Sequence, residues 1–324
     1  MSSPLPDEVS ALLDRQVGVI SRHQAIASGL GDHDIRRLVR RREWVRVHPG
    51  VYVDHSGPLT WLQRAWAAVL SCAPAALCRE SARRAADGPG RTSHDDGRPI
   101  HVAVDHSRTV TAPTGVRVHR VVDLDARTRW NASPPRERVE HAVLSLAATA
   151  RREVDAVAFL ADAVGARLTT GDRLLAALRD TSRIQRRRFL EGVIADVASG
   201  TCSTLEHGFL TRVERAHGLP TAARQVRESG KGTLFRDAVY EVFDLIVELD
   251  GRTFHAGATQ HDRDLERDLD AALDGRLTVR LGWAQVFDRS CATAVRLARV
   301  LRDRGWDGRP RRCERCPAGL DLAA

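Results

Sequence analysis

Three acidic side chains and one histidine stand close together in the sequence around a short apolar run, residues 245–249, which has the length of a buried strand. Glu248 lies inside this run. Asp237 precedes Glu248 by eleven positions, and Asp250 and His255 follow the run. A carboxylate that leaves water costs several kcal/mol unless it is paired, protonated or bound to a metal. Acids and an imidazole gathered at one strand end are typical of oxygen-ligand metal sites that cleave phosphoesters.

Such a site would hydrolyse a phosphodiester with Mg²⁺ (or Mn²⁺) as its cofactor. We expect Asp237 and Glu248 to hold the cation. Asp250 follows Glu248 by two residues and so shares its face of the strand, where it would be a third ligand or would orient a metal-bound water. His255 suits proton transfer near neutral pH. The alternative is a structural role, in which one of the many arginines holds Glu248 without a metal.

These residues resemble a known nuclease core. Asp237, followed after one predicted hairpin by Glu248-x-Asp250, is similar to the D…(D/E)xK motif of restriction-endonuclease-like, PD-(D/E)xK nucleases. The order Glu-Leu-Asp-Gly…His is closer to the branch related to very-short-patch-repair (Vsr) endonucleases. The resemblance covers about residues 203–306 and implies a DNA endonuclease or nickase in which Asp237 and Glu248 bind the metal and the histidine transfers a proton. The sequence departs from the motif because Asp250 occupies its lysine position, and the only lysine is Lys231.

Glu206 has two open interpretations. The resemblance implies that a glutamate on the first helix of the nuclease fold joins the catalytic site, and Glu206 occupies that position. The segment Ser203-Thr-Leu-Glu206 also matches a capping box, in which the serine side chain and the glutamate side chain each bond the other's backbone amide.

The N-terminal segment, residues 7–53, has the pattern of a winged helix-turn-helix. Helices are expected over residues 8–16, 22–28 and 33–41, followed by two short strands within residues 44–53. Ser21 and Asp32 are the expected N-caps of the second and third helices, and Gly29 ends the second. The segment resembles the N-terminal domain of AbiE-type antitoxins, from Ser-Arg-His-Gln-Ala at Ser21 to Arg-Val-His-Pro-Gly-Val-Tyr-Val at Val53.

Arginines are dense on and just after the third predicted helix. The expected DNA-binding residues are Arg36, Arg37, Arg40, Arg41 and Arg42, with Arg46 on the wing. This helix is the one that enters the major groove in winged helix-turn-helix proteins, so its arginines favour contact with DNA. A solvated basic face is the alternative. The predicted partner is double-stranded DNA, and the antitoxin resemblance adds a toxin or other protein as a candidate.

Composition supports a globular, nucleic-acid-binding chain. The 324 residues are 43% hydrophobic and carry a net charge of +8, almost all of the positive charge being arginine. The length predicts two or three domains, and the positive charge makes nucleic acid the leading partner. Nothing at the N-terminus resembles a signal peptide and no apolar run approaches membrane length, so we expect a soluble, cytoplasmic protein without membrane contact.

The predicted fold class is α/β (α+β overall). The expected domains are a winged helix-turn-helix (1–58), a mainly helical connecting domain with a small β hairpin (59–200), a restriction-endonuclease-like mixed sheet flanked by helices (201–308), and a flexible tail (309–324). The hairpin strands are expected over residues 100–105 and 116–121. From residue 203 the expected order is helix, three strands, helix (262–273), strand and helix.

The six cysteines, at positions 72, 78, 202, 291, 313 and 316, form no disulfide framework. Cys313-x-x-Cys316 is half of a zinc site. Cys291 is a candidate third ligand, but the sequence shows no fourth. We therefore expect the tail to hold two free thiols and no structural zinc.

Two functions follow. The first is a metal-dependent DNA endonuclease or nickase, a phosphodiester hydrolase, and the three carboxylates and the histidine favour it. The second is a non-catalytic, antitoxin-type transcriptional repressor with a degenerate nuclease fold, and the missing motif lysine favours that one.

Overall fold

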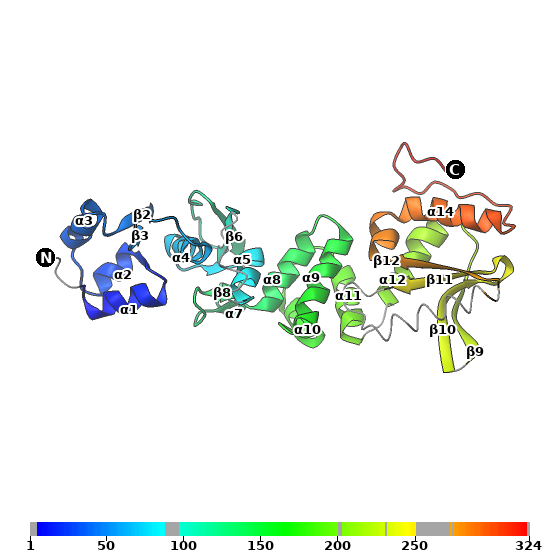
Figure 1. The fold of residues 1–324 in the computed structure, drawn as a ribbon, viewed down its shortest axis with the longest axis horizontal. Coiled ribbons are helices and arrows are strands. Elements are labelled where there is room, and N and C mark those ends of the chain that lie inside the picture. Colours follow the sequence, from blue (N-terminus) through cyan, green and yellow to red (C-terminus); the bar gives the residue numbers. More distant parts are fainter. Residues whose placement is uncertain are drawn as a thin grey trace. The chain divides into compact units, whose positions relative to one another are not determined.

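The computed structural model of the protein describes residues 5–87, 97–199, 203–230, 232–250, 273 and 275–322. The chain divides into two compact units, Met1–Leu146 and Ala147–Ala324 (Figure 1). The division passes through the segment 59–200 that the sequence groups as one connecting domain. No helix in the described ranges is long and apolar enough to cross a membrane. The mixed α and β content agrees with the predicted fold class.

The first unit begins with the predicted winged helix-turn-helix. Its elements are α1 (Asp7–Arg15), β1 (Val19–Ser21), α2 (Arg22–Ala27), α3 (Asp32–Arg40), β2 (Val45–His48) and β3 (Val51–Val53). The three helices and the wing hairpin are confirmed. The sequence analysis missed β1, which pairs antiparallel with β3 and gives a three-stranded sheet in the order β1-β3-β2. Val9, Ile20, Leu38 and Trp44 belong to the core between helices and sheet.

Side-chain hydrogen bonds fix the starts of α2 and α3. Ser21 caps α2 as predicted, since its hydroxyl accepts from the Gln24 amide at 3.2 Å and the Gln24 side chain accepts from the Ser21 amide at 3.0 Å. The predicted cap Asp32 is wrong, because α3 begins one residue earlier, with Gly31 as its N-cap. Asp32 instead accepts two hydrogen bonds from the Arg22 guanidinium, at 2.9 and 2.7 Å, and so ties the start of α2 to the start of α3.

A second sheet completes this unit. The remaining elements are α4 (Trp61–Cys72), β4 (Ala76–Leu77), α5 (Arg79–Ala86), β5 (Ile100–Asp105), β6 (Val116–Val121), α7 (Leu124–Arg127), β7 (Thr128–Arg129), β8 (Arg136–Glu137) and most of α8 (Val139–Thr149), which continues past Leu146 into the second unit. The sheet order is β6-β5-β4-β8-β7. Strands β5 and β6 are confirmed, but they run parallel, so the small hairpin expected there is wrong. Alternation of apolar residues shows which face of a strand is buried but not the direction of its neighbour.

The second unit is a helical group followed by a mixed sheet. Its helices are α9 (Glu153–Gly165), α10 (Gly171–Asp180), α11 (Arg187–Ser199), α12 (Ser203–Gly208), the π-helical η1 (Phe209–Arg215), the 3-10 turn η2 (Glu241–Phe243), the π-helical η3 (Ala284–Asp288) and α14 (Ser290–Asp303). Its strands are β9 (Ala223–Gly230), β10 (Gly232–Tyr240), β11 (Leu245–Asp250) and β12 (Leu277–Gly282).

The sheet order is β12-β11-β10-β9. Strands β9, β10 and β11 are antiparallel to their neighbours along the chain, and β12 runs parallel to β11. This is the predicted order of elements after residue 203; the helix predicted over residues 262–273 lies outside the described residues except at Leu273. The apolar run on β11 is buried as predicted, with Leu245, Ile246 and Val247 fully inaccessible to solvent.

A buried glutamate joins the helical layer to the sheet. Glu214 on η1 is 1% exposed. Its Oε2 atom accepts from the Arg224 guanidinium at 2.8 Å, from the Tyr240 hydroxyl at 3.1 Å and from the Ala222 amide at 3.3 Å. The Arg224 guanidinium also lies 5.1 Å from the centre of the Phe209 ring. Burial, followed by the nearby Glu214 charge, raises the pKa of Tyr240, so its hydroxyl stays a donor.

We predict that Glu214→Gln lowers the free energy of unfolding of the second unit by about 3 kcal/mol, because it leaves the Arg224 charge without its partner. Tyr240→Phe removes one hydrogen bond and should cost about 1–2 kcal/mol. Urea denaturation combined with hydrogen exchange of the β9 and β10 amides measures both losses. Glu191 on α11 is exposed, so the control variant Glu191→Gln should change stability by less than about 0.5 kcal/mol. Equal effects of Glu214→Gln and Glu191→Gln would contradict this assignment.

Candidate functional site

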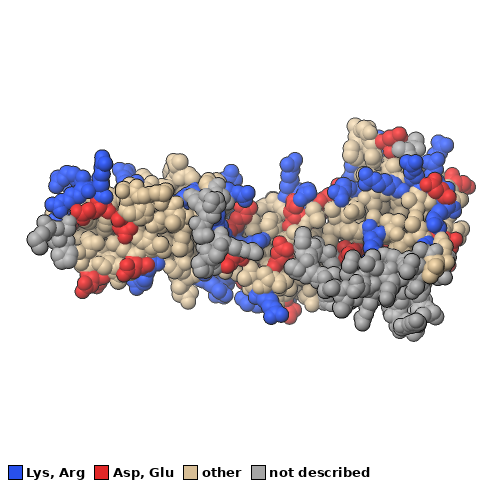
Figure 2. All heavy atoms as spheres, in the orientation of Figure 1, with Lys and Arg blue, Asp and Glu red and all other residues tan. Residues whose placement is uncertain are grey.

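Helix α3 turns an arginine-rich side to solvent. Its inner side is anchored by Ile35 and Leu38, which are 3% and 5% exposed. Arg36 and Arg40, one helical turn apart, are exposed on the opposite side. Arg37 is half-buried, and its guanidinium lies 3.0 Å from the Asp34 carboxylate. In Figure 2 the basic side chains gather over the end of the unit where Figure 1 places α3.

The turn after α3 presents two more arginines. Arg41 is the C-cap, and Arg42 follows it in the left-handed conformation with φ of 58°. In this turn the Arg42 amide donates to the Val39 carbonyl at 3.1 Å, and the Glu43 amide donates to the Leu38 carbonyl at 3.0 Å. A left-handed conformation costs a residue with a Cβ roughly 1–2 kcal/mol, and glycine avoids that cost. The fold therefore keeps an exposed arginine at a position that suits glycine.

Several of these arginines form no ion pair with any residue that the structure describes. They are Arg36, Arg40, Arg42 and Arg46, and all four are exposed. The Arg22 hydrogen bond lowers the pKa of Asp32, and the charge of Arg36, one turn further along α3, lowers it further. Arg46 lies on β2, opposite Tyr52 of β3, in the wing. By contrast Arg37 is paired as described above, and the Arg41 guanidinium lies 3.8 Å from Glu43. The structure thus brings all six predicted DNA-binding arginines to α3, its C-terminal turn and the wing, and leaves four of them available to an external anion.

The acidic group lies where β10 and β11 separate. Their pairing extends to Ala238 and Val247, and one position further the Asp237 carboxylate accepts a hydrogen bond from the Leu249 amide at 2.7 Å. Burial raises the pKa of Asp237, and the charge of Glu206 raises it further. The structure therefore places Glu206 near enough to act on Asp237 electrostatically. The role of Glu206 in catalysis stays a prediction.

Glu248 is held by an arginine that the sequence analysis did not single out. The Arg236 guanidinium donates to Glu248 Oε1 at 2.9 Å, and Arg236 is only 4% exposed. Burial raises the pKa of Glu248, the Arg236 hydrogen bond opposes that rise, and the Asp237 charge adds to it. This contact gives Glu248 the arginine partner that the structural alternative requires, and its role as a metal ligand stays a prediction. The place of Arg236 beside Asp237 in the sequence was the one signal that pointed to it.

Asp250 and His255, the other predicted residues of the acidic site, are not shown to join Asp237 and Glu248. Asp250 is at the exposed end of β11. His255 lies outside the described residues. Within the described part of the chain, Asp237, Glu248 and Asp250 do not form a group of three ligand atoms close enough to share one cation. The Mg²⁺ site and the catalytic roles of these residues stay predictions.

The tail cysteines have a different environment from the one expected. Cys313 and Cys316 lie with His217 and Cys291, and the four ligand atoms are all within 4.8 Å of one another. The expectation that only two potential ligands come together in the tail is therefore wrong. Cys316 and His217 are 99 positions apart, so only the folded chain shows their proximity.

Comparison with known protein families gives one finding for the N-terminal unit. Residues 7–53 match the family described as transcriptional regulator, AbiEi antitoxin. The match covers the winged helix-turn-helix and confirms the N-terminal part of the resemblance; it does not extend to the β9–β12 sheet. A comparison with curated proteins finds no match.

We predict opposite pH effects for two changes at the acidic group. Because the folded state raises the pKa of Asp237, the ionised Asp237 lowers stability once the pH exceeds its ordinary value of about 4. Asp237→Asn should therefore gain stability over the native protein as the pH rises from 4 to 7. Arg236→Gln should lose about 2–3 kcal/mol at pH 7, and less at pH 4, where protonation relieves the unpaired Glu248.

Denaturation curves across this pH range measure both differences. Glu191→Gln on α11 removes an exposed carboxylate of the same unit and should show no such trend. A pH-independent difference for Asp237→Asn would contradict the raised pKa.

Proposed function

We propose that this protein is a DNA-binding transcriptional regulator of the antitoxin type, which contacts duplex DNA through α3 and the β2–β3 wing. The observation that carries the proposal is the set of four exposed arginines, on α3, its C-terminal turn and the wing, that form no ion pair with any described residue. The match of residues 7–53 to an antitoxin regulator family supports the same function. A toxin partner belongs to the proposal because that family is described as an antitoxin.

The interface would divide its contacts by position. Arg36 and Arg40 project from the exposed side of α3, where a guanidinium fork can bond guanine O6 and N7 in the major groove. Arg42 and Arg46 flank the helix and suit the phosphates on either side of the groove. The Arg22–Asp32 ion pair and the apolar anchors Ile35 and Leu38 hold α3 at a fixed angle to α2. The helix is thus positioned in the free protein, so DNA binding loses little conformational entropy from ordering it.

A second candidate function is metal-dependent phosphodiester hydrolysis in the second unit. The observation in its favour is the pair Asp237 and Glu248 at neighbouring positions of two strands, where burial raises the pKa of both carboxyls. Mg²⁺ prefers oxygen ligands such as these carboxylates, and it would supply charge neutralisation and an activated water. The Arg236 hydrogen bond to Glu248 Oε1 weighs against this function, because a guanidinium already neutralises the charge that would attract a cation.

We predict that the double variant Arg36→Gln, Arg40→Gln in the full chain weakens duplex DNA binding and lowers its dependence on salt. For each phosphate that the variant no longer neutralises, the slope of log K against log salt should fall by about 0.9. If these arginines bond bases instead, the variant should lose about 1–3 kcal/mol for each of them and prefer one DNA sequence over another less strongly. Fluorescence anisotropy with a labelled duplex across salt concentrations measures these effects.

The matched control is Arg129→Gln, Arg179→Gln, which removes the same charge from exposed arginines on β7 and α10. It should leave affinity within about twofold, because neither arginine lies on α3, its C-terminal turn or the wing, and salt screens charges that make no direct contact with DNA. Equal losses for the two double variants would show general charge attraction and contradict an interface on α3.

A plasmid assay separates the two candidate functions. If the acidic group is a nuclease site, supercoiled DNA should be relaxed or linearised in Mg²⁺ or Mn²⁺, and Asp237→Asn should abolish this. His255→Ala should then slow cleavage by roughly two to four orders of magnitude, the usual contribution of a proton-transfer group. Salt-sensitive binding of intact plasmid, with no cleavage in either metal, is the result that the regulator proposal predicts.

A further inference from the structure

The C-terminal tail after α14 has no apolar core of its own to hold it in place. Within residues 311–322 no residue is buried, and the segment contains only turns between irregular stretches. Fixing the backbone of each residue in one conformation costs conformational entropy. A segment of this length without buried apolar side chains needs another source of stabilisation, and its two cysteines are at the point where it approaches the helices.

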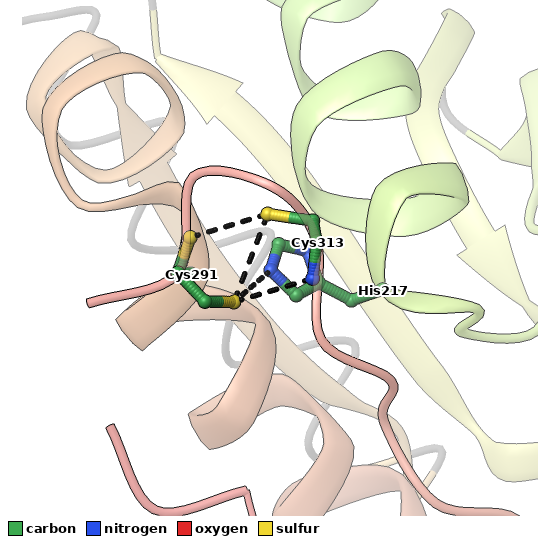
Figure 3. A group of neighbouring side chains, drawn as sticks. His217, Cys291 and Cys313 are labelled. Carbon is green, nitrogen blue, oxygen red and sulfur yellow. Dashed lines mark hydrogen bonds between the residues drawn. The ribbon is translucent and has the colours of Figure 1, made fainter. Parts of the chain in front are cut away.

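Four potential metal ligands converge at this point from three separate segments (Figure 3). His217 follows η1, Cys291 is in the first turn of α14, and Cys313 and Cys316 are in the tail. His217 and Cys291 are 0% and 7% exposed. We propose that these four side chains form a structural zinc site that fastens the C-terminal tail to η1 and α14.

The distances fit a tetrahedral ion. Cys291 Sγ lies 3.6 Å from Cys313 Sγ, Cys313 Sγ lies 3.7 Å from Cys316 Sγ, and Cys316 Sγ lies 3.6 Å from His217 Nε2. With zinc–sulfur bonds of about 2.3 Å and tetrahedral angles, neighbouring sulfur ligands are about 3.8 Å apart. A disulfide would bring two sulfurs to about 2.05 Å and would leave the third cysteine unpaired. The thiols are free in the structure.

Hydrogen bonds around the ligands favour the His217 tautomer and the thiolate form that metal binding requires. The Val213 carbonyl lies 3.1 Å from His217 Nδ1, so Nδ1 carries the proton and Nε2 offers its lone pair toward the cysteines. In the tail the Cys313 amide donates to Cys316 Sγ at 3.4 Å, a contact that stabilises a thiolate. The Cys316 amide donates to the Cys313 carbonyl at 3.1 Å and closes the turn that holds both sulfurs on one side.

The tail is also aligned with the helix that carries the histidine. The Arg311 amide donates to the His217 carbonyl at 2.8 Å, and the Arg311 guanidinium donates to the Arg215 carbonyl at 2.8 Å. These bonds place Cys313 two residues away from the point of attachment.

The donor set identifies the metal and its role. Three thiolates and one imidazole in a closed four-ligand arrangement select zinc over magnesium or calcium, which prefer oxygen. Because all four positions are taken by protein side chains, none is open for a substrate or an activated water. The site is therefore structural and separate from the acidic group on β10 and β11. The metal would also hold Arg312 and Arg315 of the tail at a pocket that Arg188 and Arg212 line as well.

Metal analysis of the full chain, purified without added metal, tests the proposal directly. We expect one zinc per chain, falling to none in the double variant Cys313→Ser, Cys316→Ser. Cys72→Ala, which changes a buried cysteine on α4 of the other unit, is the control and should retain the zinc. The variant His217→Cys should also retain it, because a fourth thiolate replaces the imidazole.

Two measurements on the unaltered sequence keep the test valid if a variant fails to fold. Cobalt exchanged for zinc should give the visible absorption of a tetrahedral cobalt–thiolate centre. Chelation should expose three further thiols to a thiol reagent and increase hydrogen exchange of the tail amides. A chain without bound zinc that takes up no cobalt, or one whose mass shows a disulfide among these cysteines, would overturn the proposal.

Discussion

Charge that leaves water must find a partner, and arginine is the partner that this chain supplies most often. The protein has 50 lysines and arginines against 42 acids, and only one of the 50 is lysine. In the second unit, guanidinium groups hold Glu214 through Arg224 and Glu248 through Arg236. The planar guanidinium can bond several acceptors at once, and its charge opposes the protonation that burial favours. At Glu214 the Tyr240 hydroxyl and the Ala222 amide donate as well. These contacts connect η1 to the sheet and join neighbouring strands.

The same constraint distinguishes the arginines that support the fold from those available for binding. On α3 and the wing, Asp32, Asp34 and Glu43 each occupy one arginine, and the exposed arginines that remain outnumber the acids beside them. An anionic partner can satisfy this excess without breaking an existing contact. At the acidic group the carboxyls already have arginines near them. Burial raises the pKa of Asp237 and Glu248, and the charges of Arg236, Arg224 and Arg280 oppose that rise. A divalent cation there would bind beside guanidinium groups of its own charge, whereas DNA at α3 would meet arginines that form no ion pair with a described residue.

Sequence patterns predicted the helices and strands that are determined by residues close together in the chain. The helix-turn-helix follows from apolar spacing and from Ser21 as a cap, and β11 follows from an apolar run of strand length. The cap of α3 was assigned to Asp32 because aspartate is a common cap, yet an ion pair with Arg22, ten positions away, takes that carboxylate. The parallel pairing of β5 with β6 also escaped prediction, because strand direction depends on the path of the connection and not on alternation.

The candidate sites show the same division. The basic face of α3 could be predicted because a helix presents neighbouring residues together, and the acids on β10 and β11 could be predicted because one tight connection joins the strands. Arg236 could not be chosen among so many arginines until the fold showed it buried against Glu248. The group of His217, Cys291, Cys313 and Cys316 was beyond sequence reasoning, because its ligands come from three segments and histidines are spread over the chain.

Hydrogen exchange can locate the DNA interface on the full chain, because it reports protection segment by segment. The measurement compares exchange with and without a DNA duplex at low salt. If α3 and the wing bind DNA, peptides covering residues 32–53 exchange more slowly with the duplex, added salt reverses this, and the β9–β11 amides are unchanged. Protection confined to residues 203–250, with residues 32–53 unaffected, would assign DNA to the second unit and rule out an interface on α3 and the wing.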